Sequence, residues 1–298
     1  MEKVKKFDIH VHSYVWENRS LPCDNIKRHI LPHELRHKYD SMGIERGVLL
    51  ASIDEDYSIM ELANKYSSET AQKYPDLFAW FCGVDPRIIE NNPKIDFSAI
   101  LDENKKMGAK GVGELCTPIQ IDGEIMDRFY SSCEECDMPI IIHLQPIEAN
   151  GYGLRDTLGL PGLENVLKRH PKLKVFGHSA MFWSHIGGEV TLETMDSYTK
   201  GRVTPNGAII RMLREYDNLY CDMSASSGEN AFFRDTEFAY KMIDEFQDRL
   251  LFGTDIGGVT TKRRLADWLD ESAQSGLISE TAYRKISREN AMRLLNLD

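Results

Sequence analysis

Eight short apolar runs, separated by longer polar segments that mostly have helical spacing, are the feature of this sequence that most limits its fold. The runs are rich in β-branched and aromatic residues and nearly continuous in apolar character, as expected for strands covered on both faces. They lie at residues 7–12, 47–52, 78–84, 109–115, 139–144, 173–178, 218–224 and 249–255. Strands that alternate with helices join into a parallel sheet through right-handed crossovers, and eight such strands are the number that closes into a barrel. The pattern predicts an α/β fold of the (β/α)₈ type, with an open doubly wound sheet as the structural alternative.

The intervening segments predict helices that would cover this sheet. Helical spacing occurs at residues 58–74, 97–108, 124–136, 161–170, 231–246, 261–276 and 279–297. The chain has 298 residues, somewhat more than the roughly 250 that such barrels usually need, and no repeat or linker divides it. We therefore expect one domain over residues 1–298. Two long connections, residues 13–32 and 179–204, follow strand ends where barrel enzymes carry their active-site loops.

Charge and cysteine content limit the partners and the compartment. The formal net charge of −11 opposes general binding to nucleic acid or to anionic membranes. No apolar run approaches the roughly 18 residues of a membrane span, and the N-terminal residues do not resemble a signal peptide, so we expect a cytoplasmic protein. The six cysteines are too scattered for a disulfide framework. Cys133 and Cys136 form a CxxC, but it lies in a helix-like stretch without the further ligands of a zinc site.

The most informative short motif is Asp8-Ile9-His10-Val11-His12. Side chains two residues apart on a strand point to the same face, so His10 and His12 would converge. Two imidazoles of nearly fixed separation at a strand end suit zinc or another borderline divalent ion. An HxH pair alone is more often a pair of solvent-facing or hydrogen-bonded histidines.

Further residues of the metal-ligand type end other predicted strands. They are Glu114, His143, His178 and Asp255. Strand C-termini of a closed barrel meet at one mouth, so side chains far apart in sequence would share one cavity suited to one or two metal ions.

At this point the sequence resembles the amidohydrolase superfamily, in particular the amidohydrolase-related branch that includes aminocarboxymuconate semialdehyde decarboxylase. The resemblance covers residues 7 to 295 and keeps the family's motif order. It rests on the segments FDIHVHS, GVGEL, IIIHL, KVFGHSA, LLFGTDI and RENAMRLL. After the sixth strand the chain has HSAMFWSH where those decarboxylases have a glycine-rich HAGG-type turn, and this departure weakens the match to them.

The resemblance implies a divalent metal bound by four of these residues, with zinc expected first and manganese or another ion as alternatives. The implied ligands are His10, His12, His143 and Asp255. His178 would hydrogen-bond the metal-bound water or the substrate in a mononuclear site, or bind a second ion in a binuclear one. Glu114 would bridge two ions or remain a hydrogen-bonded carboxylate behind the ligands. No lysine stands at the matching strand end to carry a carbamate bridge.

Three residues outside this set are candidates for substrate contact. Trp183 in the long loop would contribute to an apolar pocket wall, with packing of the loop as an equal alternative. Arg202 and Arg234 would suit a carboxylate-bearing substrate, because a guanidinium binds a carboxylate with two hydrogen bonds. Bracing of a loop carbonyl is the commoner role for such an arginine.

The function expected from these residues is metal-dependent hydrolysis of an amide, lactone or other ester-like bond of a small molecule. A metal-activated water would attack, Asp255 would transfer the proton, and His178 would polarise the carbonyl. The alternative is a lyase, either a non-oxidative decarboxylase or a hydratase that uses the same site. A non-catalytic metal-binding barrel is a further alternative. A GxSxG elbow, a P-loop and a GxGxxG fingerprint are missing, and the oligomeric state, including a homo-oligomer, stays open.

Overall fold

The fold is built on a ring of parallel strands that the sequence pattern predicts. The computed structural model describes residues 3–14, 29–51 and 57–297. The strands are β1 (Lys6–Val11), β2 (Ile44–Leu50), β3 (Phe78–Phe81), β4 (Val112–Leu115), β5 (Ile140–Pro146), β6 (Leu154–Asp156), β7 (Val175–His178), β8 (Leu219–Asp222) and β9 (Leu250–Leu251).

Hydrogen bonds close these strands into a barrel. One sheet has the order β1-β2-β3 and the other β4-β5-β7-β8-β9, with β6 as an extra strand on β5. A parallel bridge between Cys82 and Val112 joins β3 to β4. A second bridge, between Val11 and Ile256, joins β1 to the segment after β9. The open-sheet alternative is therefore wrong, and the predicted (β/α)₈ barrel is confirmed.

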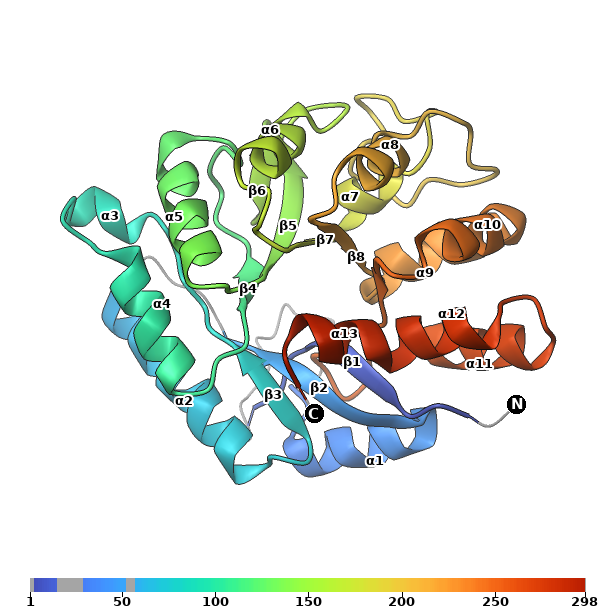
Figure 1. Ribbon diagram of the computed structural model, residues 1–298, viewed down its shortest axis with the longest axis horizontal. Coiled ribbons are helices and arrows are strands. Elements are labelled where there is room, and N and C mark those ends of the chain that lie inside the picture. Colours follow the sequence, from blue (N-terminus) through green and yellow to red (C-terminus); the bar gives the residue numbers. More distant parts are fainter. Residues whose placement is uncertain (1–2, 15–28, 52–56, 298) are drawn as a thin grey trace.

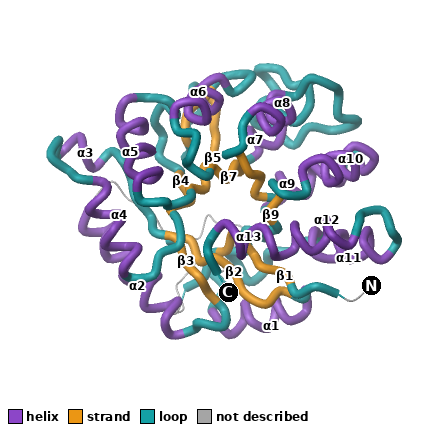
Figure 2. Tube along the Cα trace, viewed as in Figure 1, coloured by secondary structure: helices purple, strands orange, loops and turns teal. Residues whose placement is uncertain are grey.

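Helices surround this ring on its outside, as Figures 1 and 2 show. Their bounds are α1 (Pro32–Met42), α2 (Tyr57–Lys73), α3 (Ile88–Asn91), α4 (Phe97–Lys106), α5 (Glu124–Glu135), α6 (Pro161–Arg169), α7 (Ala180–Ser184), α8 (Ala208–Glu215), α9 (Ala225–Phe233), α10 (Thr236–Phe246), α11 (Leu265–Gln274), α12 (Glu280–Arg284), the π-helical segment η1 (Lys285–Glu289) and α13 (Asn290–Leu294). None of the helices in the described part of the chain is long and apolar enough to cross a membrane.

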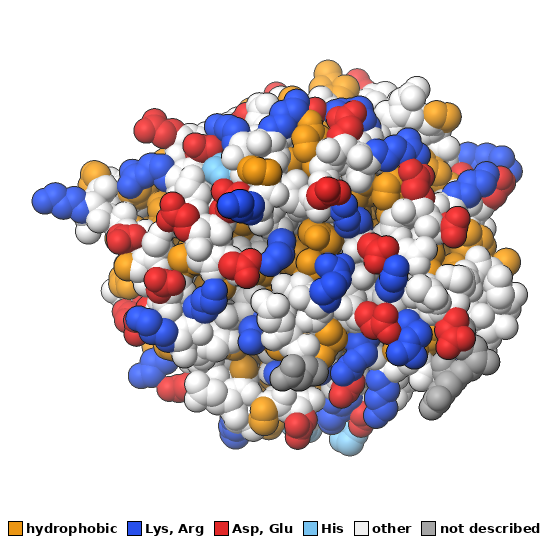
Figure 3. All heavy atoms as spheres, viewed as in Figure 1, with side chains coloured by type: hydrophobic (Ala, Val, Ile, Leu, Met, Phe, Trp, Pro, Cys, Tyr) orange, Lys and Arg blue, Asp and Glu red, His pale blue; other side chains and the backbone are white. Residues whose placement is uncertain are grey.

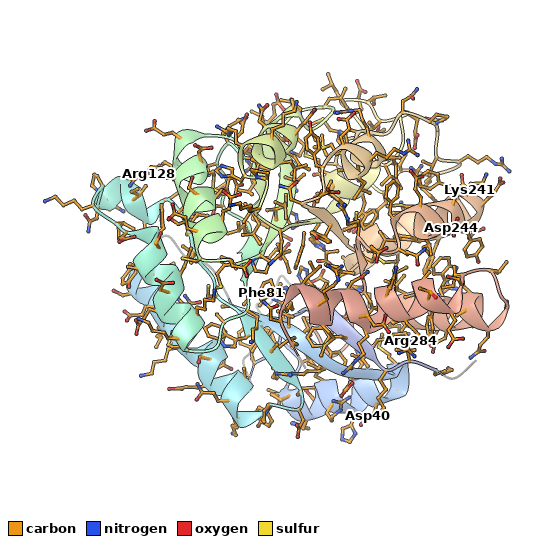
Figure 4. The ribbon with its side chains drawn as sticks, viewed as in Figure 1. Asp40, Phe81, Arg128, Lys241, Asp244 and Arg284 are labelled. Atoms are coloured by element: carbon orange, nitrogen blue, oxygen red, sulfur yellow. The ribbon has the colours of Figure 1, made fainter. Side chains whose placement is uncertain are left out.

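The apolar residues form two separate cores. The larger core fills the layer between the strands and the outer helices. The smaller one fills the barrel interior with residues such as Ile9, Phe81 and Phe176, and Leu294 of α13 packs against it. In Figure 4, Phe81 lies near the middle of the molecule, whereas the labelled charged side chains lie on the outer helices. The C-terminal helix α13 thus covers one end of the barrel, which Figure 1 shows in front, and leaves the other end for the strand C-termini.

Among the predicted elements that differ from the structure, one helix and one strand have a clear physical reason. The expected helix 231–246 is divided into α9 and α10, because Asp235 caps the start of α10 by accepting a hydrogen bond from the Phe238 backbone N–H at 3.2 Å. The expected strand 249–255 is reduced to β9, Leu250–Leu251. After Leu251, the Thr254 backbone N–H donates a 2.9 Å hydrogen bond to the Asp8 side chain and not to a backbone carbonyl of a neighbouring strand.

The outer face in Figure 3 carries acidic and basic side chains close together, with no broad area of one sign. The negative net charge is therefore not concentrated on this face. Most of these charged pairs lie in solvent, where an ion pair contributes little to stability.

A buried ion pair links β1 to the C-terminal helices. The Lys6 side chain is fully buried, and its Nζ pairs with Asp270 of α11. Asp270 also accepts a 2.7 Å hydrogen bond from the Tyr283 hydroxyl of α12. Burial alone would raise the pKa of Asp270, but Lys6 and Tyr283 hold it below its ordinary value. The pair therefore stabilises the fold above the unfolded pKa of the carboxyl, about 3.9, and this contribution is lost as the pH falls through the lower folded pKa.

Removal of this partner is expected to destabilise the protein strongly. We predict that Asp270→Ala lowers the free energy of unfolding by about 3–5 kcal/mol, because it leaves the Lys6 ammonium buried without a counter-charge. Denaturant unfolding at pH 7 measures the change. The matched control is Glu103→Ala, which removes an exposed pair with Lys106 and should change stability little. Equal effects of the two substitutions would contradict the predicted role of Lys6–Asp270.

Candidate active site

The C-terminal end of β1 brings His10, the penultimate residue of the strand, and His12, which follows it, to the barrel mouth. Phe7 and Ile9 point into the barrel interior, whereas the Asp8 carboxylate contacts the Tyr39 hydroxyl of α1 at 2.6 Å. The register between β1 and β2 is irregular between Asp8 and Val11. His10 follows Ile9 and turns toward the strand ends, where its Nε2 lies 3.2 Å from Nε2 of His12. The two imidazoles converge as the HxH spacing predicts. Regular alternation of side chains along the strand would also place Asp8 beside them, but the irregular register leaves Asp8 against Tyr39.

Asp8 instead links β1 to the segment after β9 through hydrogen bonds beneath the site. Its two carboxylate oxygens accept hydrogen bonds from the His10 and Thr254 backbone N–H groups and from the Tyr39 and Thr254 hydroxyls. Burial raises the pKa of Asp8 to about 6, although these donors oppose the rise. The Asp255 N–H donates to the His10 carbonyl at 2.8 Å. These hydrogen bonds between β1 and the segment after β9 therefore fix the relative positions of His10 and Asp255.

Donor atoms of four residues lie at the mouth, and those of His10, His12 and Asp255 all lie within 4.8 Å of one another. His10 Nε2 lies 3.6 Å from Asp255 Oδ1 and 3.6 Å from Glu114 Oε2. His12 Nε2 lies 3.5 Å from the same Asp255 oxygen and 4.0 Å from the same Glu114 oxygen. Ligands about 2.0–2.2 Å from a shared cation are separated by about 3–4 Å. The group of His10, His12 and Asp255 therefore fits a divalent metal, and Glu114 forms an adjoining group with His10 and His178.

Glu114 lies at the centre of the site. It is close to several of the other candidate residues, which its position at the end of a strand did not by itself predict. Its Oε1 lies 2.6 Å from His143 Nδ1 and 3.6 Å from His178 Nε2. Burial alone would raise the pKa of the Glu114 carboxyl, but His10 and His143 hold it well below its usual range. A second group of close donor atoms consists of Glu114, Cys116 and His143. His143 thus lies against Glu114, and its expected bond to the same ion as His10 stays a prediction.

Asp222, which the sequence analysis missed, holds two of the histidines from behind. Its fully buried Oδ2 lies 2.7 Å from His10 Nδ1 and 3.2 Å from His178 Nδ1. A carboxylate at Nδ1 fixes the proton there and turns the Nε2 lone pair of each ring toward the mouth. Gly253 leaves the space for it, because a Cβ at that position would lie 2.7 Å from Asp222 Oδ1. The sequence did contain an indication of this role: Asp222 is a carboxylate near the end of the predicted strand 218–224, as Asp255 is at the end of the predicted strand 249–255.

His178 lies beside the donor cluster, buried under Ser224. The Ser224 hydroxyl is 3.1 Å from His178 Nδ1. Burial and the nearby His10 charge lower the pKa of His178, but Asp222 and Glu114 outweigh them, and the pKa is raised overall. The structure therefore brings together the six residues that the strand-end argument selected, namely His10, His12, Glu114, His143, His178 and Asp255.

Three non-glycine residues at the mouth adopt backbone conformations that L-amino acids rarely adopt. The φ angles are +52° at Asp255, +63° at Ala225 and +107° at Ser179. Such conformations cost free energy, typically about 1–3 kcal/mol each, and persist where the surroundings enforce them. Asp255 therefore points its carboxylate toward His12 because the backbone turns sharply there.

A cavity of about 380 Å³ opens beside this cluster. His143, His178 and Asp255 form its inner part, and the loop between α7 and α8 supplies Asp196 and Tyr198 to its wall. Its volume lies within the range of small-molecule sites, about 300–1,000 Å³.

The three expected substrate contacts do not line this cavity. Arg202 is 86% exposed and its nearest charged partner is Glu237, at 3.9 Å. The Arg234 guanidinium is buried against Glu189 at 2.7 Å, so it braces the loop, the commoner role for an arginine in such a position. Trp183 is buried and donates from Nε1 to the Asp222 carbonyl at 3.1 Å. Its packing role, which the sequence left open, is the one the structure supports.

The family model of an amidohydrolase matches residues 54–297 of the chain. The chain belongs to this amidohydrolase family. The resemblance stated from the motifs is thereby confirmed. No curated protein sequence matches the chain.

Solved structures with the same fold include several decarboxylases. A 2,6-dihydroxybenzoate decarboxylase from Rhizobium is 18% identical with a TM-score of 0.61, and the match covers 98% of each chain. A dihydroxybenzoic acid decarboxylase from Polaromonas with bound manganese and 2-nitroresorcinol is 17% identical with a TM-score of 0.61, covering 98% of this chain and 96% of that one. A 5-carboxyvanillate decarboxylase from Novosphingobium aromaticivorans, with manganese and a nitrobenzoic acid, is 19% identical with a TM-score of 0.58, covering 88% and 79%. At these identities the likeness concerns the fold.

Proposed function

We propose that this amidohydrolase-family protein is a metal-dependent decarboxylase that releases CO₂ from a small aromatic acid. The observation that carries the proposal is the donor cluster of His10, His12 and Asp255, with spacings of 3.2–3.6 Å, which adjoins Glu114 and a small-molecule cavity. Support for decarboxylation comes from the three structural neighbours described above, which are decarboxylases, two of them with bound manganese. These neighbours favour the lyase over the hydrolase that the sequence alone put first.

The proposed metal ligands are His10 of β1 and His12 just after it, together with Glu114 and Asp255. Two imidazoles and two carboxylates form a mixed nitrogen and oxygen set that suits both manganese and zinc. Manganese is our first choice because two neighbours contain it. The bound cation would supply Lewis-acid polarisation of the substrate carboxylate and of an adjacent oxygen. Asp222 would hold the His10 ring in the tautomer that ligation requires.

Asp255 and His178 are the proposed proton-transfer and charge-stabilising groups. The Asp255 carboxyl lines the cavity, and its Oδ2 lies 3.8 Å from Arg263, so one oxygen faces the donor cluster and the other a cation. Asp255 would take up an acidic proton of the arriving substrate and deliver it to the carbon that bears the carboxylate. Protonation uses an electron pair of the ring. The bond to that carboxylate then breaks, its electron pair returns to the ring and restores the aromatic system, and CO₂ departs. His178 would hold the neighbouring substrate oxygen during the step.

Release of CO₂ from carboxyl-labelled acids tests the proposal. The purified protein, supplied with Mn²⁺, is offered 2,6-dihydroxybenzoate and 5-carboxyvanillate labelled with ¹³C at the carboxylate, together with a panel of anilides and lactones. We expect labelled CO₂ from the monocarboxylic acid 2,6-dihydroxybenzoate, loss of this activity to background with a chelator, and recovery with Mn²⁺. Hydrolysis of an anilide or lactone without CO₂ release would favour the hydrolase, and no turnover at full metal content would favour a non-catalytic barrel.

A further inference from the structure

The outer wall of the cavity carries a carboxylate that has no counter-ion. Asp196 lies in the loop between α7 and α8 and lines the cavity together with Gln145 at the end of β5 (Figure 1). Gln145 Nε2 donates to Asp196 Oδ2 at 3.2 Å. No lysine or arginine among the described residues pairs with Asp196 or lines the cavity. Burial raises the pKa of the Asp196 carboxyl, and His143 and Arg155 oppose the rise only in part.

Asp196 and Gln145 retain capacity to accept hydrogen bonds from a ligand. An ionised carboxylate accepts about four hydrogen bonds, and Gln145 is the side chain that donates to this one. With Nε2 of Gln145 directed at Asp196, its Oε1 remains an acceptor. Two acceptor groups side by side on a cavity wall recognise a ligand group that donates hydrogen, such as a hydroxyl or an amino group.

The remaining walls suit a flat ring. Tyr152 and Tyr198 both line the cavity, and the Tyr152 ring lies 4.7 Å from the His143 ring between centroids. Aromatic side chains of this kind offer large contact surfaces to an aromatic ligand. The Asp196 carboxylate would repel a second negative group on such a ring, because no lysine or arginine among the described lining residues offsets its charge.

We propose that Asp196 and Gln145 determine substrate specificity by binding a hydroxyl or amino substituent of the aromatic acid. This inference rests on the proposed function for the identity of the reacting carboxylate, but the binding it describes is measurable without turnover. The site then selects monocarboxylic acids with a hydrogen-bond donor on the ring and excludes dicarboxylic acids.

Binding of unreactive probes to the Mn²⁺-loaded protein tests this proposal by calorimetry. Resorcinol and phenol differ by one donor hydroxyl, and isophthalate carries a second carboxylate. For the parent we expect resorcinol to bind about 10-fold or more tightly than phenol, since a hydrogen bond to a charged group contributes that much. Asp196→Asn should weaken resorcinol binding at least several-fold, leave phenol within about 2-fold, and strengthen isophthalate binding because a like charge is removed.

The opposite signs for resorcinol and isophthalate separate recognition from a structural role, because a distorted loop would weaken every probe. Asp196→Ala is the second variant and should abolish the preference for resorcinol over phenol. The matched control is Glu193→Gln, which neutralises an exposed carboxylate of the same loop that contacts Thr191. Unchanged probe preferences in both Asp196 variants would overturn the proposal even where CO₂ release is found. Probe preferences that depend on Asp196 without any CO₂ release would uphold it and refute the proposed reaction alone.

Discussion

Asp255→Asn is expected to lower kcat by a factor of about 10²–10⁴, the usual contribution of a positioned acid or base. The amide oxygen can still face His10 and His12, whose Nε2 atoms lie 3.6 and 3.5 Å from Asp255 Oδ1, so metal and substrate binding should change much less. The amide cannot carry the proton. Steady-state kinetics of parent and variant at equal metal occupancy measure the difference, with the acid that proves to be a substrate.

The control for this variant is Asp244→Asn, the same chemical change on the outer helix α10, where Figure 4 shows the side chain away from the barrel. It should leave kcat and KM unchanged. Near-parental kcat of Asp255→Asn would reduce Asp255 to a ligand and would transfer the proton step to another group, with His178 as the next candidate.

The His10→Ala/His12→Ala double variant is expected to lose its bound metal almost completely. It removes both imidazoles of the His10, His12 and Asp255 group, whose atoms lie 3.2–3.6 Å apart, and carboxylates alone rarely retain a transition metal against dilution. Elemental analysis after extensive dialysis measures the content and, for the parent, decides between one ion and two. The matched control is His33→Ala/His37→Ala, which removes two exposed histidines of α1 and should retain the parental content.

Measurement of metal affinity, in place of metal content alone, tests the role of Asp222. Asp222→Asn keeps the shape of the side chain but loses the carboxylate that contacts Nδ1 of His10 and His178. Loss of such a partner behind a ligand typically weakens metal binding by about 10–100-fold.

For the His10→Ala/His12→Ala variant, a parental metal content would show that any bound ion lies elsewhere.

The barrel could be predicted from the sequence because its signals are local. Continuous apolar runs and helical spacing report burial of single elements, and eight such units leave few ways to bury all the apolar faces. Closure depended on contacts between residues far apart, such as Cys82 with Val112 and Val11 with Ile256. The division of residues 231–246 at Asp235 depended on a capping hydrogen bond that competes with helical periodicity.

The candidate site divides in the same way. The sequence alone determined that His10, His12, Glu114, His143, His178 and Asp255 lie at one mouth, because strand C-termini of a barrel converge there. Only the tertiary structure decided that Glu114 contacts four histidines, that Asp222 supports His10 and His178, and that Arg202, Arg234 and Trp183 lie outside the cavity while Asp196 lines it. The physical reason is that strand position fixes where a side chain starts, whereas loop paths and hydrogen-bond partners fix where its charged end lies.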